Sequence, residues 1–469
     1  METKIILGPP GTGKTTRLLD IIELEIQRGV APNKIAFCSF TKKATEEAIA
    51  RVCDRFDFKK ADLVYFRTIH SLAFMSAGLK RDQVMQNKDY STIGNHLGLQ
   101  FSSNRDFADS GTTVTGRNPG DQYMFIDGFS RARRVPQKQV WDMISHDNLN
   151  WHEYLRYSDT VKQYKDSRGL YDFADMLEAT DSPLDVEVLI LDEAQDLSTA
   201  QWDFVTRKFS RVHRCYVGGD DDQAIFEWSG ADVSRFINLD GSKEILTQSY
   251  RIPAKVHYLA DGISSRIKQR VPKIYNSRAE AGNIEYWPDI DHIDMSSGSW
   301  LLLARNSYLL GELSASTKEK GHRYLIRGKD SIRPADVKAI QLWEMHRNGY
   351  ILDDKDKMSL KEYTSRTESQ DIWHEAFDKL NTETKEYYIS LLRRGESLTA
   401  TPRINISTIH GSKGGEADNV ALLTDMSYST WDAINLDEDS EHRVWYVAAT
   451  RTRQNLHIVM PRGRYGYTL

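Results

Sequence analysis

The chain has 469 residues, more than one hydrophobic core usually organises, so the sequence predicts two to four domains. Hydrophobic residues make up 40% of it and charged residues 28%, as in a soluble globular protein, and no apolar run is long enough to span a bilayer. The formal net charge of −5 gives no global basic signature, so any nucleic-acid contact needs a local groove. A strand pattern begins by Lys4 and leaves no room for a secretory signal, so we expect a cytoplasmic protein without membrane contact.

Strand-like runs rich in β-branched or aromatic residues recur along the chain, and helical patterns lie between most of them. The runs are Lys4–Leu7, Lys34–Ser39, Val186–Leu191, Arg214–Val217, Trp300–Leu303, Arg403–Ser407, Val420–Leu423 and Leu456–Val459. This alternation predicts an α/β fold of mainly parallel sheets with helices on both faces, and the number of strands is enough for two such layers.

Two stretches break the alternation. Residues 80–165 hold a polar loop at 111–120 and an aromatic-rich helical pattern, which predicts a mostly helical insertion. A polar helical block at 353–394 predicts a smaller insertion in the second half.

The most informative local pattern is Gly-Pro-Pro-Gly-Thr-Gly-Lys-Thr at residues 8–15, between a strand and a helical segment. Glycines let backbone N–H groups wrap phosphates, and the positive end of the helix points at them. A chance Gly-Pro turn is the alternative, but spacing and context both match a phosphate-binding loop. We therefore expect triphosphate contacts from Gly8, Pro9, Pro10, Gly11, Thr12, Gly13, Lys14, Thr15, Thr16 and Arg17, with Lys14 on the β- and γ-phosphates and Thr15 on Mg²⁺.

A pair of acids, Asp192 and Glu193, follows the apolar strand ending at Leu191. Ligands bind at the carboxyl edge of open α/β sheets, so Asp192 is expected to hold Mg²⁺ and Glu193 to act as general base for an attacking water. For the acids alone a solvent-exposed helix start would be favoured, but their place after a strand and the phosphate loop at 8–15 favour the catalytic interpretation.

The predicted strand Arg214–Val217 is followed by Gln223, and the aromatic residues Phe226 and Trp228 come shortly after Gln223. An amide donates and accepts at once, so Gln223 could sense a γ-phosphate and pass that information along its segment. The two rings suit base stacking, although core packing explains them equally well on isolated evidence.

Two arginines in the second half, Arg251 and Arg451, complete the candidate catalytic set. A guanidinium suits the charge that develops on a transferring phosphoryl group. If both reach the nucleotide, hydrolysis is coupled to closure of a second lobe. Taken singly, each arginine is better explained as a surface salt-bridge partner, because arginines are common and their convergence in space is not visible in the sequence.

In order, these segments resemble the UvrD/Rep/PcrA-type superfamily 1 helicases, from Gly8 to about Leu456. The strings that carry the resemblance are residues 8–15, 39–45, 68–71, 172–175, 192–196, 219–231, 248–251, 408–416 and 446–451. Departures are Thr16 before Arg17, where the family commonly has arginine directly, and Ser229, where it often has arginine.

The resemblance implies two RecA-like lobes with ATP between them and translocation along a single DNA strand with 3′-to-5′ polarity. It implies that Tyr250 stacks on adenine and Glu416 contacts the ribose. It also implies that the DNA strand is faced by Phe40, Thr41, Lys42, His70, Phe226, Trp228, Thr408 and His410. Packing is the favoured alternative for Phe40 and His70 taken alone.

The resemblance also divides the chain. Residues 1–79 and 166–240 are expected to form the ATP-binding lobe, with 80–165 as its insertion. Residues 241–350 and 401–469 form the second lobe, and 351–400 its reduced insertion. The expected cofactors are ATP and Mg²⁺, and the expected partners are single-stranded DNA and single-strand/duplex junctions, bound by a monomer.

Three activities remain compatible with these features. The leading one is an ATP-dependent DNA helicase or translocase. The others are a translocase that strips proteins from DNA with little unwinding, and a nucleotide-gated clamp or loading factor. The stacking and phosphate contacts neither require nor forbid a 2′-hydroxyl, so the sequence does not distinguish DNA from RNA.

Overall fold

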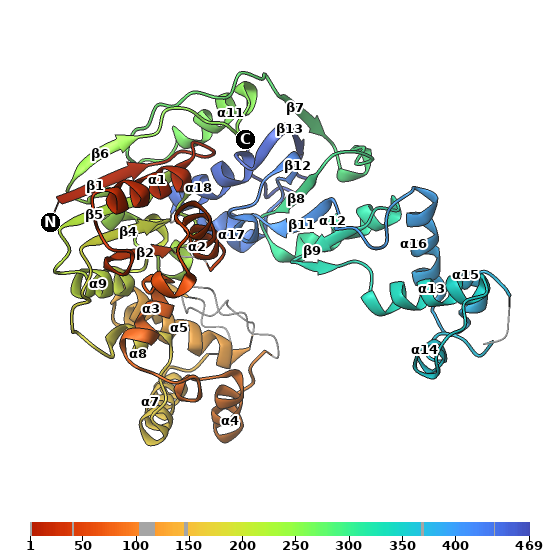
Figure 1. Cartoon of the computed structure of the whole chain (residues 1–469), viewed down its shortest axis with the longest axis horizontal. Helices are drawn as coiled ribbons and strands as arrows, with labels where there is room; N and C mark the ends of the chain where they lie inside the picture. Colours follow the sequence, from red (N-terminus) through yellow and green to blue (C-terminus); the bar gives the residue numbers. More distant parts are fainter. Residues whose placement is uncertain (1, 40–41, 103–117, 145–148, 367–369, 436) are drawn as a thin grey trace. The chain divides into compact units, whose positions relative to one another are not determined.

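The computed structural model describes residues 2–39, 42–102, 118–144, 149–366, 370–435 and 437–469 (Figure 1). The chain divides into two compact units. Unit 1 comprises Met1–Tyr250 and Ile267–Asn276, and unit 2 comprises Arg251–Arg266 and Ser277–Leu469. Among the described residues, no helix combines the length and apolar character needed to cross a bilayer.

Unit 1 is built on a six-stranded parallel sheet with the order β3-β2-β4-β5-β1-β6. Its strands are β1 (Glu2–Leu7), β2 (Ile35–Ser39), β3 (Phe66–Thr68), β4 (Val188–Asp192), β5 (Arg214–Gly219) and β6 (Ser242–Ile245). Side chains alternate between the two faces of a strand, so Ile5 and Leu7 pack in one core and Ile6 in another. The sheet is therefore buried on both faces, which explains its continuous apolar runs.

Helices cover both faces of this sheet. The core that contains Ile6 is closed by α1 (Lys14–Gln27) and α2 (Lys42–Phe56). The opposite core is closed by α3 (Ile69–Ser76), α8 (Phe173–Glu178) and α9 (Thr199–Lys208). A short helix, α10 (Val233–Ile237), follows and contributes Phe236 to that second core.

The first predicted insertion is helical in the residues that the structure describes. Its helices are α4 (Asn87–Leu97), α5 (Pro119–Arg133), α6 (Gln137–Met143) and α7 (Trp151–Arg168). They enclose a separate core rich in aromatic rings, including Tyr123, Trp141, Tyr154 and Tyr157. The expected loop at 111–120 lies largely outside the described residues.

Unit 2 contains a seven-stranded sheet with the order β10-β9-β11-β8-β12-β13-β7, parallel except where β10 pairs antiparallel with β9. The strands are β7 (Asn283–Trp287), β8 (Trp300–Ala304), β9 (Tyr324–Ile326), β10 (Lys329–Asp330), β11 (Ile404–Thr408), β12 (Ala417–Leu423) and β13 (Thr452–Val459). Its helices outside the insertion are α11 (Ala254–Ser264), α12 (Leu310–Glu319), α17 (Tyr428–Ala433) and α18 (Glu438–Ala449).

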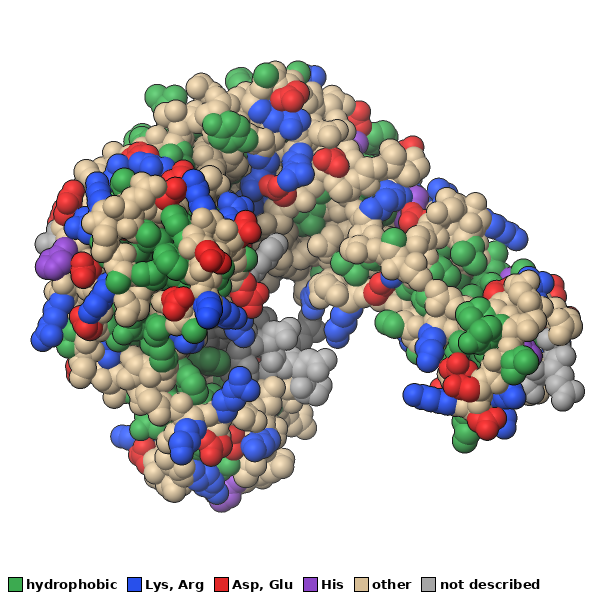
Figure 2. All heavy atoms as spheres, in the orientation of Figure 1, with side chains coloured by type: hydrophobic (Ala, Val, Ile, Leu, Met, Phe, Trp, Pro, Cys, Tyr) green, Lys and Arg blue, Asp and Glu red, His purple; other side chains and the backbone are tan. Residues whose placement is uncertain are grey.

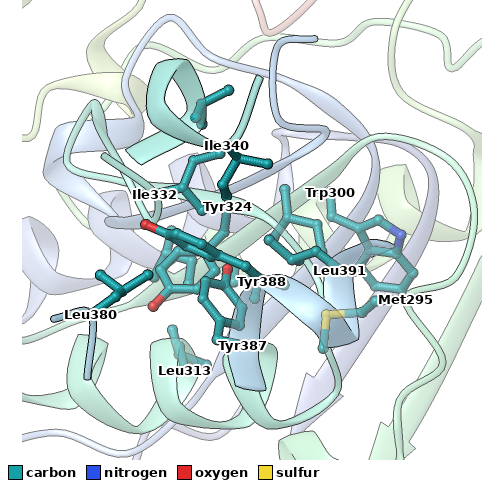
Figure 3. Close-up of a cluster of buried hydrophobic side chains, with 14 of the residues drawn as sticks. Met295, Trp300, Leu313, Tyr324, Ile332, Ile340, Leu380, Tyr387, Tyr388 and Leu391 are labelled. Carbon is teal, nitrogen blue, oxygen red and sulfur yellow. The ribbon is translucent and has the colours of Figure 1, made fainter. Parts of the chain in front are cut away.

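The second insertion shares its core with the sheet of unit 2. It contains α13 (Pro334–Arg347), α14 (Asp354–Leu360), α15 (Trp373–Ala376) and α16 (Thr382–Arg393), which lie together at the end of the unit away from β7 and β13 (Figure 1). Tyr387 and Tyr388 of α16 pack in one cluster with Trp300 of β8 and Leu313 of α12 (Figure 3). Because α13 packs with α14 and α15, we propose that the insertion begins near Pro334 rather than at residue 351.

All eight strands predicted from sequence are present, with ends shifted by a few residues. The structure adds β3, β6, β7, β9 and β10, which are short or carry exposed polar side chains. It also moves the end of unit 1 from residue 240 to Tyr250, because β6 pairs with β1. The segment Ile267–Asn276 belongs to unit 1 as well, although the sequence assigned it to the second lobe.

Candidate nucleotide site and strand-facing residues

Three predicted motifs meet because their strands are neighbours. In unit 1 the strands β4, β5 and β1 are adjacent and parallel, so their carboxyl ends lie at one edge of the sheet. The glycine-rich loop follows β1, the acid pair ends β4, and the segment with Gln223 follows β5. This is the edge at which open α/β sheets bind ligands.

The loop after β1 has the backbone that a phosphate cradle requires. Gly11 and Gly13 have φ angles of 72° and 80°, in the left-handed region that favours glycine, and Gly13 caps α1. A Cβ at Gly8 would lie 2.5 Å from the Cβ of Lys14, so only glycine fits there. The N-terminus of α1 thus presents its unpaired N–H groups beside Lys14.

Lys14 sits between the two predicted acids. Its Nζ lies 2.9 Å from Asp192 Oδ1 and 2.5 Å from Glu193 Oε1, and its side chain is 9% exposed. Burial by itself lowers the pKa of Lys14, but the two carboxylates outweigh it and hold the pKa above its ordinary value. Burial raises the pKa of Asp192, against the opposing effect of Lys14. A solvent-exposed helix start does not describe Asp192, which is 2% exposed, whereas the side chain of Glu193 is 29% exposed.

Oxygen ligands for Mg²⁺ are present at the same place. Thr15 Oγ1 lies 3.4 Å from Asp192 Oδ2. No cluster of three or more metal-ligating side chains occurs in the described residues. Mg²⁺ at nucleotide sites is usually held by one or two protein oxygens together with phosphate oxygens, so Thr15 and Asp192 fit this ion.

Glu193 is held in a strained backbone. Its φ of 53° and ψ of 39° are left-handed, which non-glycine residues adopt at a cost of about 1–3 kcal/mol and which clusters at functional sites. One carboxylate oxygen contacts Lys14, and the other accepts a 2.6 Å hydrogen bond from Gln195 Nε2. Sequence reasoning did not single out Gln195, although it stands two residues after Glu193.

The segment that bears Gln223 is anchored by buried charges. Gln223 Nε2 donates to Asp220 Oδ2 at 2.7 Å. Lys273 Nζ lies 3.1 Å from Asp220, 2.5 Å from Asp221 and 3.1 Å from Asp222, and all four side chains are at most 1% exposed. Burial, with the neighbouring carboxylates, raises the pKa of Asp220 to about 6 against the effect of Lys273. Three consecutive buried acids imply a counter-cation, but the sequence does not show which lysine supplies it.

Lys273→Met is expected to lower the free energy of unfolding of unit 1 by about 3–5 kcal/mol, since it removes the cation shared by Asp220 and Asp221, while Asp222 keeps its ion pair with Arg270. Urea unfolding measures the loss. Lys208→Met is the matched control, because Lys208 is also buried but its Nζ donates to the carbonyl of Ser182 at 3.1 Å, worth about 1 kcal/mol. Equal stability losses in the two variants would contradict the anchoring role of Lys273.

Tyr250 lies on the phosphate loop. Its N–H donates to the carbonyl of Gly11 at 2.8 Å, and Ser249 Oγ donates to the carbonyl of Pro10 at 2.8 Å. The ring of Tyr250 is 74% exposed, which leaves it open to stack on a base. Arg17 is engaged by both oxygens of Glu244, at 2.8 and 3.1 Å, and Thr16 is exposed.

Three residues predicted to contact the nucleotide, Arg251, Glu416 and Arg451, lie in unit 2. Glu416 forms ion pairs with Arg251 and Arg453. These arginines hold the pKa of Glu416 below its ordinary value, although burial alone would raise it. Arg451 is 2% exposed, and its guanidinium donates to the carbonyl of Val447 at 3.0 Å. The surface salt-bridge alternative is therefore wrong for Arg451.

The predicted strand contacts have unequal exposure. Phe40 and Thr41 lie outside the described residues. Lys42 is exposed at the start of α2, whereas His70 is 7% exposed and packs edge-on against Phe173. The remaining four are half-buried, which fits neither core packing nor full exposure: Phe226, Trp228, Thr408 and His410.

Charge is mixed over the surface. On the face drawn in Figure 2, acidic and basic side chains lie among one another on both units. A nucleic-acid contact would therefore depend on local groups, as the net charge of −5 indicates.

Comparison with known proteins agrees with this geometry. Residues 2–244 match the UvrD/REP helicase N-terminal domain, and residues 358–463 match the UvrD-like helicase C-terminal domain. The ATP-dependent DNA helicase PcrA of Bacillus subtilis is 24% identical over 311 residues, 60% of this chain and 40% of the relative. PcrA of Leuconostoc citreum is 25% identical over 318 residues, again 60% of this chain and 40% of the relative.

The first of these family matches covers more than half of the chain and contains all three strand-end motifs of unit 1. The alignments span only about two fifths of the PcrA relatives, so the activity of those longer proteins does not pass to this chain by similarity alone. With its two RecA-like α/β lobes, the chain belongs to the UvrD/REP helicase family.

Proposed function

We propose that this protein is an ATP-driven motor that moves along single-stranded DNA and unwinds duplexes. The observation that carries the proposal is the arrangement of Lys14, Asp192 and Glu193 beside a phosphate-binding loop, at the shared carboxyl edge of β1, β4 and β5. Family membership supports the same activity.

In the proposed hydrolysis, Lys14 turns from its carboxylates to the β- and γ-phosphates, while the N–H groups of the loop bind the remaining phosphate oxygens. Mg²⁺, when bound by Thr15 and Asp192, would neutralise charge on the phosphates. Glu193 would then orient a water and accept its proton, and Gln223 would report whether a γ-phosphate is present.

Two arginines of unit 2 are proposed to supply transition-state charge, and nucleotide contacts are proposed for Tyr250 of unit 1 and Glu416 of unit 2. Arg251 follows Tyr250 directly in the chain, and Tyr250 N–H binds the phosphate loop at Gly11. We propose Arg251 and Arg451 as arginine fingers, Tyr250 as the adenine platform and Glu416 as the ribose contact.

We further propose that the motor acts as a monomer with 3′-to-5′ polarity on single strands and junctions. Forked duplexes with a 3′ or a 5′ single-stranded tail test this directly, beside an ATPase assay with and without DNA. Unwinding from the 3′ tail alone supports the proposal. DNA-stimulated hydrolysis without unwinding would favour a protein-displacing translocase, and slow unstimulated hydrolysis would favour a clamp or loader.

Glu193→Gln is expected to bind ATP normally and to hydrolyse it about 10²–10⁴-fold more slowly, because the amide cannot accept the proton of the water. Fluorescent-nucleotide binding and single-turnover hydrolysis measure the two effects separately. Glu187→Gln, on the segment before β4, is the control for loss of one acidic charge. Comparable hydrolysis by Glu193→Gln and the wild-type protein would remove Glu193 from the role of base.

Trp228→Ala is expected to weaken single-strand binding by about 1–3 kcal/mol, because a half-buried ring near Gln223 would stack on a base. DNA stimulation of ATP hydrolysis should fall with it, while DNA-free hydrolysis stays near wild type. Trp431→Ala removes another partly exposed indole, on α17, and should leave strand affinity unchanged. Loss of DNA-free hydrolysis together with unfolding would show instead that Trp228 is a packing residue.

A further inference from the structure

Gln195 joins two of the motifs described above. Its side chain is fully buried, with 0% exposure. Its Nε2 donates to Glu193 Oε2 at 2.6 Å and to Asp196 Oδ2 at 3.2 Å, while its Oε1 accepts from the backbone N–H of Asp220 at 3.1 Å. One amide therefore links the end of β4 to the end of β5.

The orientation of this amide is determined by its neighbours. Carboxylates only accept hydrogen bonds and the N–H of Asp220 only donates. The nitrogen of Gln195 must therefore face Glu193, and its oxygen must face Asp220. A rotated amide would lose all three bonds in a buried site, where each unmet polar group is costly.

A glycine at the end of β5 lets the backbone approach the Gln195 amide closely. A Cβ at Gly219 would lie 2.7 Å from Gln195 Oε1, so the chain approaches the amide at a glycine. Beyond it, Asp220 accepts from Gln223 Nε2 at 2.7 Å. A continuous series of hydrogen bonds thus runs from Glu193 through Gln195 and Asp220 to Gln223.

The carboxylate of Glu193 depends on this amide for its direction. Its oxygens contact Lys14 and Gln195, and its own backbone is left-handed. In the proposed hydrolysis Lys14 turns to the phosphates, whereas the buried Gln195 amide can keep its hydrogen bond to Glu193. A misplacement of about 1 Å in a catalytic group can cost 10²-fold in rate.

We propose that Gln195 is a positioning residue for ATP hydrolysis, which holds the Glu193 carboxylate toward the attacking water and ties it to the segment bearing Gln223. The proposal rests on the ATPase function proposed above. Gln195 does not touch the nucleotide; it acts through Glu193.

Gln195→Leu removes the donor and the acceptor at similar volume. We expect kcat for DNA-free ATP hydrolysis to fall about 10–100-fold, the usual effect of losing a partner that orients an active-site ligand. KM for ATP should stay within about threefold, because the phosphate loop and Thr15 are unchanged. Gln201→Leu is the matched control, since Gln201 is 1% exposed and accepts from the backbone N–H of Ser198 at 2.9 Å without contacting Glu193.

A second variant, Gln195→Glu, keeps the hydrogen bond from the Asp220 N–H and replaces the hydrogen bond to Glu193 with repulsion between like charges. In Gln195→Glu the carboxylate still accepts from the Asp220 N–H, but it faces Glu193 and Asp196 with like charge. We expect a loss of kcat at least as large as in Gln195→Leu. Gln195→Asn, which stays neutral but withdraws the amide by one methylene, decides the question if the leucine variant does not fold.

A double-mutant cycle separates positioning from general structural damage. If Gln195 acts through Glu193, Gln195→Leu should change single-turnover hydrolysis by less than about threefold in a Glu193→Gln background. Equal losses of hydrolysis rate in the wild-type and Glu193→Gln backgrounds overturn the proposal. It is also overturned if Gln195→Leu and Gln195→Glu both fold and keep the wild-type kcat. A wild-type protein that does not hydrolyse ATP would count instead against the function proposed above.

Discussion

Lys14→Ala is expected to reduce ATP turnover by about 10³-fold or more, since a preorganised charge on the reacting phosphates is worth at least as much as a single oxyanion donor. The Nζ of Lys14 is already placed at the edge where the phosphate loop and the acid pair meet, 2.9 Å from Asp192. ATP affinity should fall as well, because the same charge binds the ground state. Steady-state hydrolysis and nucleotide titration measure both effects.

The structure refines what this substitution does to stability. Lys14 is 9% exposed and ion-paired with Asp192 and Glu193, so the substitution also removes a buried charge. Its removal leaves Asp192 beside Glu193 without a cation. The pKa of Asp192 is already raised by burial, so this group can take up a proton and limit the cost. We expect a folded but less stable variant, and circular dichroism with thermal unfolding would check this. Near-normal turnover in a folded Lys14→Ala would contradict the assignment of the phosphate loop.

The site residues that the sequence predicts are those in short motifs that directly follow an apolar strand. The glycines, Lys14 and the acid pair each follow an apolar strand, and parallel strands bring their carboxyl ends to one edge. Periodicity and apolar runs therefore located both the sheets and the residues at that edge.

Partners far apart in the chain were not predictable. Lys273 lies 52 residues from Asp221, with a segment of unit 2 between them, and Arg453 lies 37 residues from Glu416. No periodicity links such positions, because any of the chain's 62 lysines and arginines could neutralise a given carboxylate. The same reason explains why the sequence puts a lobe boundary at residue 240 while unit 1 extends to Tyr250, since β6 is a polar edge strand whose pairing with β1 leaves no apolar signal.

The half-buried rings show a different limit. Phe226 and Trp228 are half-buried. Stacking and packing demand the same aromatic residue, so composition cannot separate them. Measuring the single-strand affinity of Trp228→Ala beside its control Trp431→Ala separates stacking from packing.

Arg251→Ala is expected to lower kcat for DNA-stimulated hydrolysis by on the order of 10³–10⁵-fold, with a milder effect on ATP binding, because a finger acts mainly as charge develops on the phosphoryl group. Arg251 is also the more informative of the two proposed fingers, since Arg451 is 2% exposed and its loss would confound activity with stability. The side chain of Arg251 is 19% exposed and its partner Glu416 keeps Arg453, so the fold should persist.

Arg453→Ala is the matched control for this prediction. Both arginines bind the same carboxylate, but the side chain of Arg453 is 50% exposed and lies outside the proposed finger position. An exposed pair contributes about 0–1 kcal/mol, so Arg453→Ala should fold and hydrolyse nearly as the wild-type protein does. Equal losses of kcat in the two variants would mean that what matters is the charge around Glu416. A loss confined to Arg251→Ala would mean that this guanidinium itself stabilises the transferring phosphoryl group.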